Sequence, residues 1–283
     1  GDVCANGDMT IKQRDQLLAS MTEEVGLLVL EDNINQSLAL TLSEAEGVEG
    51  VEDKIRLMRT LEKIGLLDRA IEFLPADPQL AERQAATKGL TRPELAVLLA
   101  YSKMALYNVL LPSDLPDDPV LTPDLEGYFP KELQKRFKTE IGRHKLKREI
   151  IATVVTNAMV NRVGPSFVAS LADRTGCTWP EIARAYLIAR DVFALGPMWE
   201  QIQALDLRVG ADVQTGMHQA IRRLSERASL WFLNNCRHPL SISEAMAEFR
   251  PGVEALTKNL AEALPEADRA VLAQVAKTLT DAG

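Results

Sequence analysis

The chain has 283 residues, of which 46% are hydrophobic and 25% charged, and its formal net charge is −8. A chain of this length and composition can bury one large core or two smaller ones. The negative net charge repels phosphate backbones and anionic lipid surfaces, which argues against nucleic acid and membranes as partners.

The three cysteines, Cys4, Cys177 and Cys236, are far apart and form no Cys-x-x-Cys pair. This predicts buried free thiols in a reducing compartment. No apolar run approaches the roughly 20 residues that span a bilayer, and the N-terminus lacks the layout of a signal peptide. We therefore expect a cytoplasmic protein. The loop-like opening and the initial Gly1 suggest a piece of a longer chain, although a tag remnant would look the same.

Apolar residues recur at steps of three and four along almost the whole chain, and no segment alternates apolar and polar residues as a half-buried strand would. The pattern predicts an all-α fold, a bundle of roughly a dozen helices that could form two lobes. Three helix starts resemble capping boxes, each worth about 1 kcal/mol. The three pairs are Thr91 with Glu94, Thr178 with Glu181, and Ser241 with Glu244.

The first predicted helix covers residues 11–42, and the polar segment 43–51 ends it. Its expected apolar face consists of Leu17, Leu18, Met21, Val25, Leu28, Val29, Leu38 and Leu42. A second helix over 52–64 should end at Gly65 in a left-handed cap. A short helix follows Pro75 and Pro78. Residues 91–110 are apolar around most of the helix circumference, which predicts a helix at the centre of the bundle.

Five prolines between Pro112 and Pro130 indicate a boundary or a long surface connection. We therefore divide the chain into an N-terminal lobe (1–111), a proline-rich connection (112–130) and a C-terminal lobe (131–283). The last part should begin with a short and then a long helix over 131–163, stopped by Gly164-Pro165. Further helices are expected at about 166–175, 179–194, 197–206, 209–235, 242–249, 252–263 and 266–281.

The sequence shows no catalytic, cofactor-binding or metal-binding motif. Dinucleotide binding requires a strand followed by G-x-G-x-x-G, and the nearest glycine cluster, Gly47 to Gly50, follows a helix instead. The histidines His144, His218 and His238 lie far apart without a second ligand at helical spacing. We assign no catalytic, cofactor or metal residue.

The charged clusters have ordinary explanations. The acidic pairs Glu23-Glu24 and Asp117-Asp118 lie at a helix start and in the proline-rich segment, where solvated carboxylates are common. The basic run from Arg136 to Arg148 is predicted to be a solvated helix face, with a site for an anion or a partner as the alternative.

Polar residues follow one stripe of the predicted helix over 131–163. They are Thr153, Asn157 and Asn161, and buried amides must find hydrogen-bond partners. We expect a hydrogen-bond network between helices, with a ligand pocket as the alternative.

Several blocks of the sequence resemble one family. They are GDMTIKQRDQLL at residues 7–18, LLDRAIEFLP at 66–75, GLTRPELAVLLAYSK at 89–103 and REIIATVVTNAMVN at 148–161. In this order they resemble the C-terminal helical region of the large bacterial NAD-specific glutamate dehydrogenases, and the likeness extends over nearly the whole chain. The block at 89–103 is the most specific of them.

The resemblance implies a non-catalytic region that follows a catalytic core and serves its assembly or regulation. Enzymes of this family oxidise L-glutamate to 2-oxoglutarate and ammonium with NAD, using a catalytic lysine and a Rossmann domain that would precede Gly1. Neither motif has a matching position here, so NAD is expected in the parent enzyme and no cofactor in this chain. The implied partners are the catalytic core of the same polypeptide and further copies of the parent.

The first helix is the best candidate for docking to that core, because it emerges where the core would end. Five polar residues could make the contact: Lys12, Arg14, Asp32, Asn33 and Gln36. Two alternatives stay open. A free-standing helical interaction protein would show a native size near 31.2 kDa and an exposed apolar groove. A self-contained enzyme would need a pocket with convergent titratable groups.

Overall fold

The structure is a computed structural model that describes residues 7, 9–260, 264–266 and 269–270. Within these residues it contains fourteen α-helices and two 3-10 helices, and no β-strand. The predicted all-α, multi-helix fold is therefore confirmed. The helix expected at 266–281 lies largely outside the described residues.

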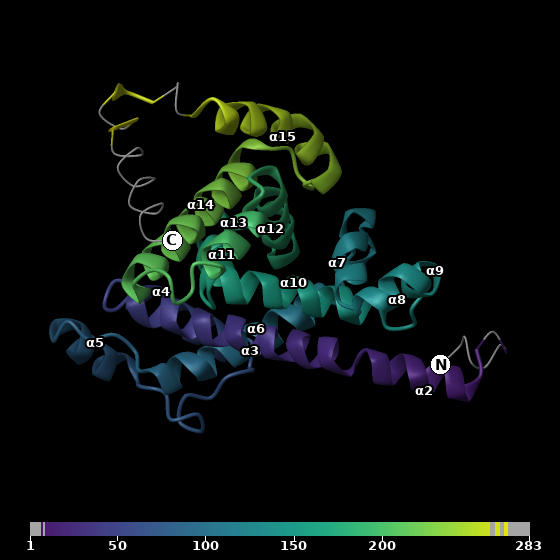
Figure 1. The fold of residues 1–283 in the computed structure, drawn as a ribbon. Helices are drawn as coiled ribbons and strands as arrows, with labels where there is room; N and C mark the ends of the chain where they lie inside the picture. Colours follow the sequence, from purple (N-terminus) through teal and green to yellow (C-terminus); the bar gives the residue numbers. More distant parts are fainter. Residues whose placement is uncertain (1–6, 8, 261–263, 267–268, 271–283) are drawn as a thin grey trace.

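The N-terminal segment forms a rod that extends away from the rest of the molecule (Figure 1). It consists of α2 (Ile11–Ser20) and α3 (Thr22–Ala45), so the single helix predicted over 11–42 is interrupted, at Met21. Hydroxyl groups on both sides of the break bond back to the helix: Ser20 Oγ donates to the Leu17 carbonyl at 2.8 Å and Thr22 Oγ1 to that of Leu18 at 3.3 Å. Such bonds compete with the helical ladder and favour a bend.

The next three helices share one hydrophobic cluster. They are α4 (Val51–Lys63), α5 (Asp77–Ala85) and α6 (Arg92–Leu110). Gly65 follows α4 with φ +73°, as predicted from its position after the helix. The capping box at the start of α6 is also present, because the Thr91 N–H donates to Glu94 Oε2 at 2.7 Å.

The proline-rich segment folds into short helices rather than an extended loop. They are η1 (Leu115–Asp117), η2 (Pro119–Leu121) and α7 (Thr122–Gly127), followed by α8 (Lys131–Arg136) and α9 (Lys138–Gly142). Leu115, Leu121 and Leu125 are fully buried, and η1 and α7 contact α10. The segment thus contributes to the core. The division of the chain into two lobes at this point stays a prediction.

Six helices complete the molecule. They are α10 (Lys147–Val163), α11 (Phe167–Thr175), α12 (Trp179–Val192), α13 (Leu195–Gln203), α14 (Ala211–Asn235) and α15 (Ile242–Lys258). Gly164, with φ +89°, ends α10 as predicted. The helices predicted at 242–249 and 252–263 are wrong as separate elements, because α15 continues through Pro251.

Tertiary contacts explain how α15 continues through a proline, which removes a hydrogen bond and costs about 3 kcal/mol in a helix interior. Just before the proline, the Phe249 ring packs edge-on against Trp231 and Phe232 of α14, with ring centroids 5.4 Å apart in both pairs. Arg250 Nη2 donates to the Asp191 carbonyl at 3.1 Å. These contacts hold the helix on the bundle directly before the proline.

The centre of the molecule is α12, which contacts α6, α10, α11, α13, α14 and α15. Every residue from Ile182 to Ala189 is buried. The expected central helix, α6, is buried on two sides and supplies side chains to both hydrophobic clusters, Leu98 to one and Leu106 to the other. It nevertheless partly exposes Met104 and Val109.

Two predicted capping boxes differ from the expectation. The Glu181 carboxylate does not turn back to Thr178. Instead, Oε2 accepts from the Leu240 N–H at 3.2 Å and lies 3.3 Å from His238 Nδ1. At α15 the Ser241 hydroxyl accepts from the Glu244 N–H at 3.4 Å, which supplies half of the box. At α12, contacts of Glu181 with His238 and Leu240 therefore take the place of the predicted cap.

Candidate functional site

The five predicted docking residues lie on the rod but do not form one surface. Lys12, Arg14, Asp32 and Asn33 are exposed, and Gln36 is half-buried. The Arg14 guanidinium donates to the neighbouring Asp15 carboxylate at 2.6 Å, and Gln36 Nε2 donates to Asp32 Oδ2 at 3.0 Å. Asp32 and Asn33 are successive helical residues and therefore point in different directions. Docking through these groups stays a prediction.

The rod instead exposes large apolar side chains, of which only Leu18, Val25 and Val29 belong to the apolar face expected from the sequence. We call this set the α2–α3 apolar surface. It consists of Ile11, Leu18, Val25, Leu27, Val29, Leu30 and Ile34. Leu27 is 60% exposed and Val29 66%. Leu18, Val25 and Val29 of the expected apolar face are thus exposed rather than packed against another element.

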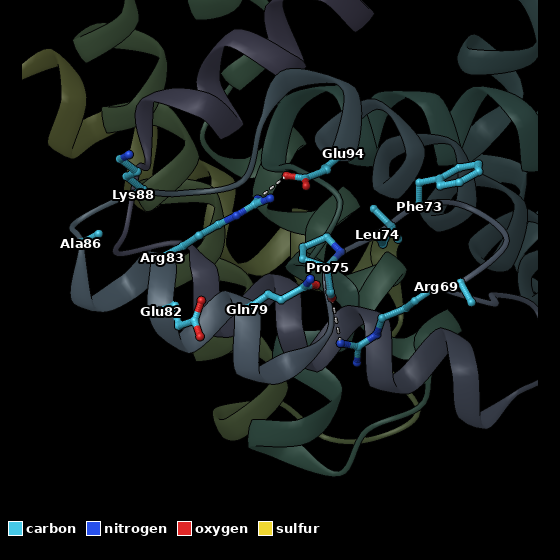
Figure 2. A pocket seen from close by; sticks show the side chains of 11 residues that line it. Arg69, Phe73, Leu74, Pro75, Gln79, Glu82, Arg83, Ala86, Lys88 and Glu94 are labelled. Carbon is cyan, nitrogen blue, oxygen red and sulfur yellow. Dashed lines mark hydrogen bonds and ion pairs between the residues drawn. The ribbon is translucent and has the colours of Figure 1, made fainter.

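A hollow of about 610 Å³ lies between the loop after α4, helix α5 and the start of α6 (Figure 2). The two arginines that line it are already paired. Arg83 Nη1 donates to Glu94 Oε2 at 2.7 Å, and Arg69 Nη1 donates to Asp77 Oδ1 at 2.6 Å. Hydrogen bonds from Arg69 and then Arg59 lower the pKa of Asp77. The hollow is therefore held together by ion pairs that a bound anion would have to break.

Phe73 lies at one end of this hollow, as Figure 2 shows, with 90% of its surface exposed and a left-handed backbone, φ +54°. That conformation costs a non-glycine residue on the order of 1 kcal/mol or more. The loop is fixed from inside by Leu74 and by the Tyr101 hydroxyl, which donates to Glu72 Oε1 at 2.6 Å. No sequence pattern indicated this exposed ring.

A buried ionic group joins the end of the rod to the bundle. The Glu46 carboxylate, directly after α3, bonds both Lys54 of α4 and Arg222 of α14. The Lys54 side chain is almost fully buried and also donates to the Gly50 carbonyl at 3.3 Å. A Cβ at Gly50 would collide with Lys54 Nζ, so the glycine in this turn leaves space for the ammonium group. These contacts give the Gly47 to Gly50 cluster a structural role.

Polar groups on α10 and α14 lie buried without partners among the described residues. They include Asn161 Oδ1, Thr156 Oγ1, Arg162 Nη1 and His218 Nε2. The predicted network is therefore wrong for Asn161, whose oxygen has no partner, while Thr153 Oγ1 donates to the Glu149 carbonyl of its own helix. Burial and the charge of Arg162 lower the pKa of His218 to about 4. The imidazole is neutral at pH 7.

The remaining chemical candidates have local contacts. Cys177 and Cys236 are free thiols but half-buried, so the predicted full burial is wrong, and Cys4 lies outside the described residues. His144 and His238 are exposed. Across the described part of the chain, no group of three or more His, Cys, Asp or Glu side chains has the geometry of a metal site, and no helix is long and apolar enough to cross a membrane.

The basic run is mostly exposed, and several of its members meet acidic groups. Lys138 Nζ lies 3.1 Å from Glu126, and Arg148 bonds Asp117 and donates to the Leu111 carbonyl at 2.8 Å. Of the other acidic groups, Glu24 Oε1 accepts from the Lys131 N–H at 2.9 Å. These carboxylates serve as structural links between elements.

Comparison with known proteins assigns the two ends of the chain to two family models. The model described as "Glutamate dehydrogenase, C-terminal" matches residues 87–283. The model described as "Bacterial NAD-glutamate dehydrogenase, catalytic domain" matches residues 1–43. The chain belongs to the glutamate dehydrogenase C-terminal family. The resemblance stated from the sequence blocks is therefore confirmed.

Curated relatives of this glutamate dehydrogenase family match along almost the whole chain. The NAD-specific glutamate dehydrogenase of Pseudomonas aeruginosa is 44% identical over 100% of this chain and 17% of its own length. That of Halomonas elongata is 44% identical over 93% of the chain and 16% of its own length, and that of Mycobacterium tuberculosis 33% identical over 98% and 17%. The chain thus corresponds to a C-terminal part, about a sixth, of such enzymes.

The two matches divide the structure at the rod. The catalytic-domain match covers α2 and almost all of α3, and it contains all five predicted docking residues and the whole α2–α3 apolar surface. The C-terminal match covers the elements from the start of α6 onward. The rod is therefore the part of the described chain that matches catalytic domains, and it is directly attached to the helical bundle.

Proposed function

We propose that this chain is the non-catalytic C-terminal helical region of an NAD-specific glutamate dehydrogenase and serves the assembly or regulation of the catalytic core. The parent would convert L-glutamate and NAD to 2-oxoglutarate, ammonium and NADH. Its catalytic core, on the same polypeptide, would be the principal partner, and the parent would be a cytoplasmic homo-oligomer.

The observation that carries this proposal is the way the rod is attached to the bundle. Arg92, at the start of α6, clamps the second half of α3: its guanidinium donates to the Ser37 carbonyl and to Thr41 Oγ1, each at 3.1 Å. Gln203 of α13 donates to Asn35 Oδ1 at 3.0 Å. A helix that matches catalytic domains over almost its whole length and is fixed to the bundle through its second half can transmit a displacement between the two, since a helix is stiff along its axis.

The described residues do not fit NAD. A dinucleotide site places the pyrophosphate on a helix N-terminus after a strand and a glycine-rich turn, and the described part of the chain has no strand. We therefore assign NAD binding and the chemical step to the rest of the parent. No residue of this chain is given a catalytic, cofactor or metal role.

The proposal is tested by an immunoblot of source-cell extract with an antibody to this chain, combined with an assay of glutamate-dependent NAD reduction in the immunoprecipitate. We expect a band several times larger than 31.2 kDa that carries the activity. A band at 31.2 kDa without activity would contradict the proposal and favour the alternative, a free-standing helical interaction module.

A further inference from the structure

The α2–α3 apolar surface is unusual because large apolar side chains of two helices are exposed to solvent. A helix that is apolar around most of its circumference is normally covered on all sides. On α3, Leu27, Leu30 and Ile34 are spaced three and four residues apart and share one face, while Val25 and Val29 share another. The bundle covers only the side that carries Ala39 and Leu42, both buried. The exposed faces therefore lack the neighbours that their composition calls for.

The exposed part of the rod is held in position. Its N-terminal helix begins with a capping box, in which Gln13 Oε1 accepts from the Thr10 N–H at 2.9 Å. Near the start of α3, the Glu24 carboxylate binds the Lys131 N–H of α8. Figure 1 shows α8 and α9 above this end of the rod and no helix below it. The apolar side chains are thus presented on an ordered support, which reduces the entropy that docking would cost.

We infer that the α2–α3 apolar surface is the docking site for the catalytic portion of the same polypeptide. This inference rests on the proposed function, because it requires a parent that contains that portion. Every member of the surface lies within residues 1–43, the segment that matches the catalytic-domain family. The relatives are several times longer than this chain, so most of their catalytic domain lies outside it.

The side chains exposed on the rod indicate which chemistry the partner surface needs. Leucine, isoleucine and valine side chains require an apolar groove, into which the face with Leu27, Leu30 and Ile34 would fit as a helix in a groove. Glu23 and Glu31 are exposed beside these residues. Lysine or arginine side chains at the rim of the groove would therefore complement the charge and fix the orientation of the helix.

Photo-cross-linking in the full-length parent enzyme tests the inference. A benzophenone amino acid replaces Leu30, and a matched control carries it at Leu256 of α15, which is similarly exposed and lies outside the catalytic match. Mixing isotopically light and heavy enzyme before illumination separates bonds within one polypeptide from bonds between copies. We expect position 30 to cross-link to the catalytic portion of its own polypeptide and position 256 not to do so.

Cross-links from position 30 to another copy, or none at all, would overturn the inference. A second variant keeps the result interpretable: Leu27→Gln with Leu30→Gln should raise amide hydrogen exchange of residues 22–34 at least ten-fold in the full-length enzyme, whereas Leu256→Gln should not. An unmodified parent without glutamate-dependent NAD reduction would overturn the proposed function. An active parent without the cross-link would overturn the docking inference alone.

Discussion

Helix α12 and the rod made of α2 and α3 both carry many large apolar side chains but have opposite environments. In α12 even a charged side chain is enclosed: Arg184 is buried and pairs with Asp118 at 3.1 Å and Asp114 at 3.0 Å. In α2 no residue is buried. The difference lies in the neighbouring elements. Helix α12 contacts six other helices, whereas α2 makes its main contacts with α3 alone. Composition shows that a helix needs covering, and only the surrounding chain decides whether it is covered.

The largest contrast should appear when one leucine is shortened in each region. We expect Leu187→Ala in α12 to lower the free energy of unfolding of this chain by about 2–5 kcal/mol, because it leaves a cavity in a closed core. Leu30→Ala in the rod should change it by about 0.5 kcal/mol or less. Urea unfolding of both variants measures the difference, and equal losses would break the comparison.

The junction of the rod and the bundle gives the next largest effect. Glu46→Gln would leave the buried Lys54 ammonium and Arg222 without their shared carboxylate, at an expected cost of about 3 kcal/mol. Glu44→Gln is the matched control, since this carboxylate pairs with Arg92 at 3.2 Å but is exposed, and should cost less than about 1 kcal/mol. Thermal denaturation followed by circular dichroism checks both, and a larger loss in the control would contradict the ionic role of Glu46.

A pH effect of intermediate size should come from His218 in the covered part of α14. Burial lowers the pKa of His218 from 6.5 to about 4, with a further contribution from Arg162, so the folded state favours the neutral imidazole. Unfolding then takes up a proton between these two values. Stability from this group is complete above pH 6.5 and is lost as the pH falls toward 4, by on the order of 2–3 kcal/mol.

The histidine prediction is checked by urea unfolding at several pH values between 4 and 7 for the native chain and for His218→Gln. The variant should lose the part of the pH dependence that belongs to this residue. The exposed His144, changed in the same way, is the control and should leave the profile almost unaltered. Identical profiles for the native chain and His218→Gln would exclude a neutral buried imidazole.

The smallest effect on stability is expected from the polar docking residues of the rod. Lys12→Ala with Asp32→Ala and Asn33→Ala should leave the unfolding of this chain within about 0.5 kcal/mol, because the three side chains are exposed. In the parent enzyme the same changes should lower activity or assembly if these groups contact the core. Glutamate-dependent NAD reduction and native mass measure this, with the exposed Lys63→Ala as control. An unchanged parent would remove these residues from the docking site.

Local sequence signals predicted helix ends correctly where the backbone conformation of one residue ends the helix. Gly65 and Gly164 end their helices because both adopt positive φ, which glycine tolerates without strain. Predictions from local sequence were wrong where a contact with a distant segment determined the structure. They broke α15 at Pro251, although the aromatic contacts of Phe249 hold the helix together. Local sequence also predicted that Glu181 caps its own helix, although its carboxylate accepts a hydrogen bond from the Leu240 N–H.

The candidate site was less predictable than the fold. Helical periodicity predicts an apolar face that includes Leu18, Val25 and Val29, but all three side chains are exposed. The docking residues predicted from the sequence are polar, as Lys12 and Asn33 are. The available signal was the excess of apolar positions in α3, more than a single buried face requires.

The sequence by itself determined that this protein is helical, where several of its helices end, and which family it resembles, because periodicity, glycine conformation and sequence blocks are properties of short segments. Only the tertiary structure decided that α12 rather than α6 lies at the centre, that Glu46 joins three elements, and that the α2–α3 apolar surface is left uncovered. Each of these depends on which distant residues meet, and the burial of a side chain is a property of its neighbours as much as of its own chemistry.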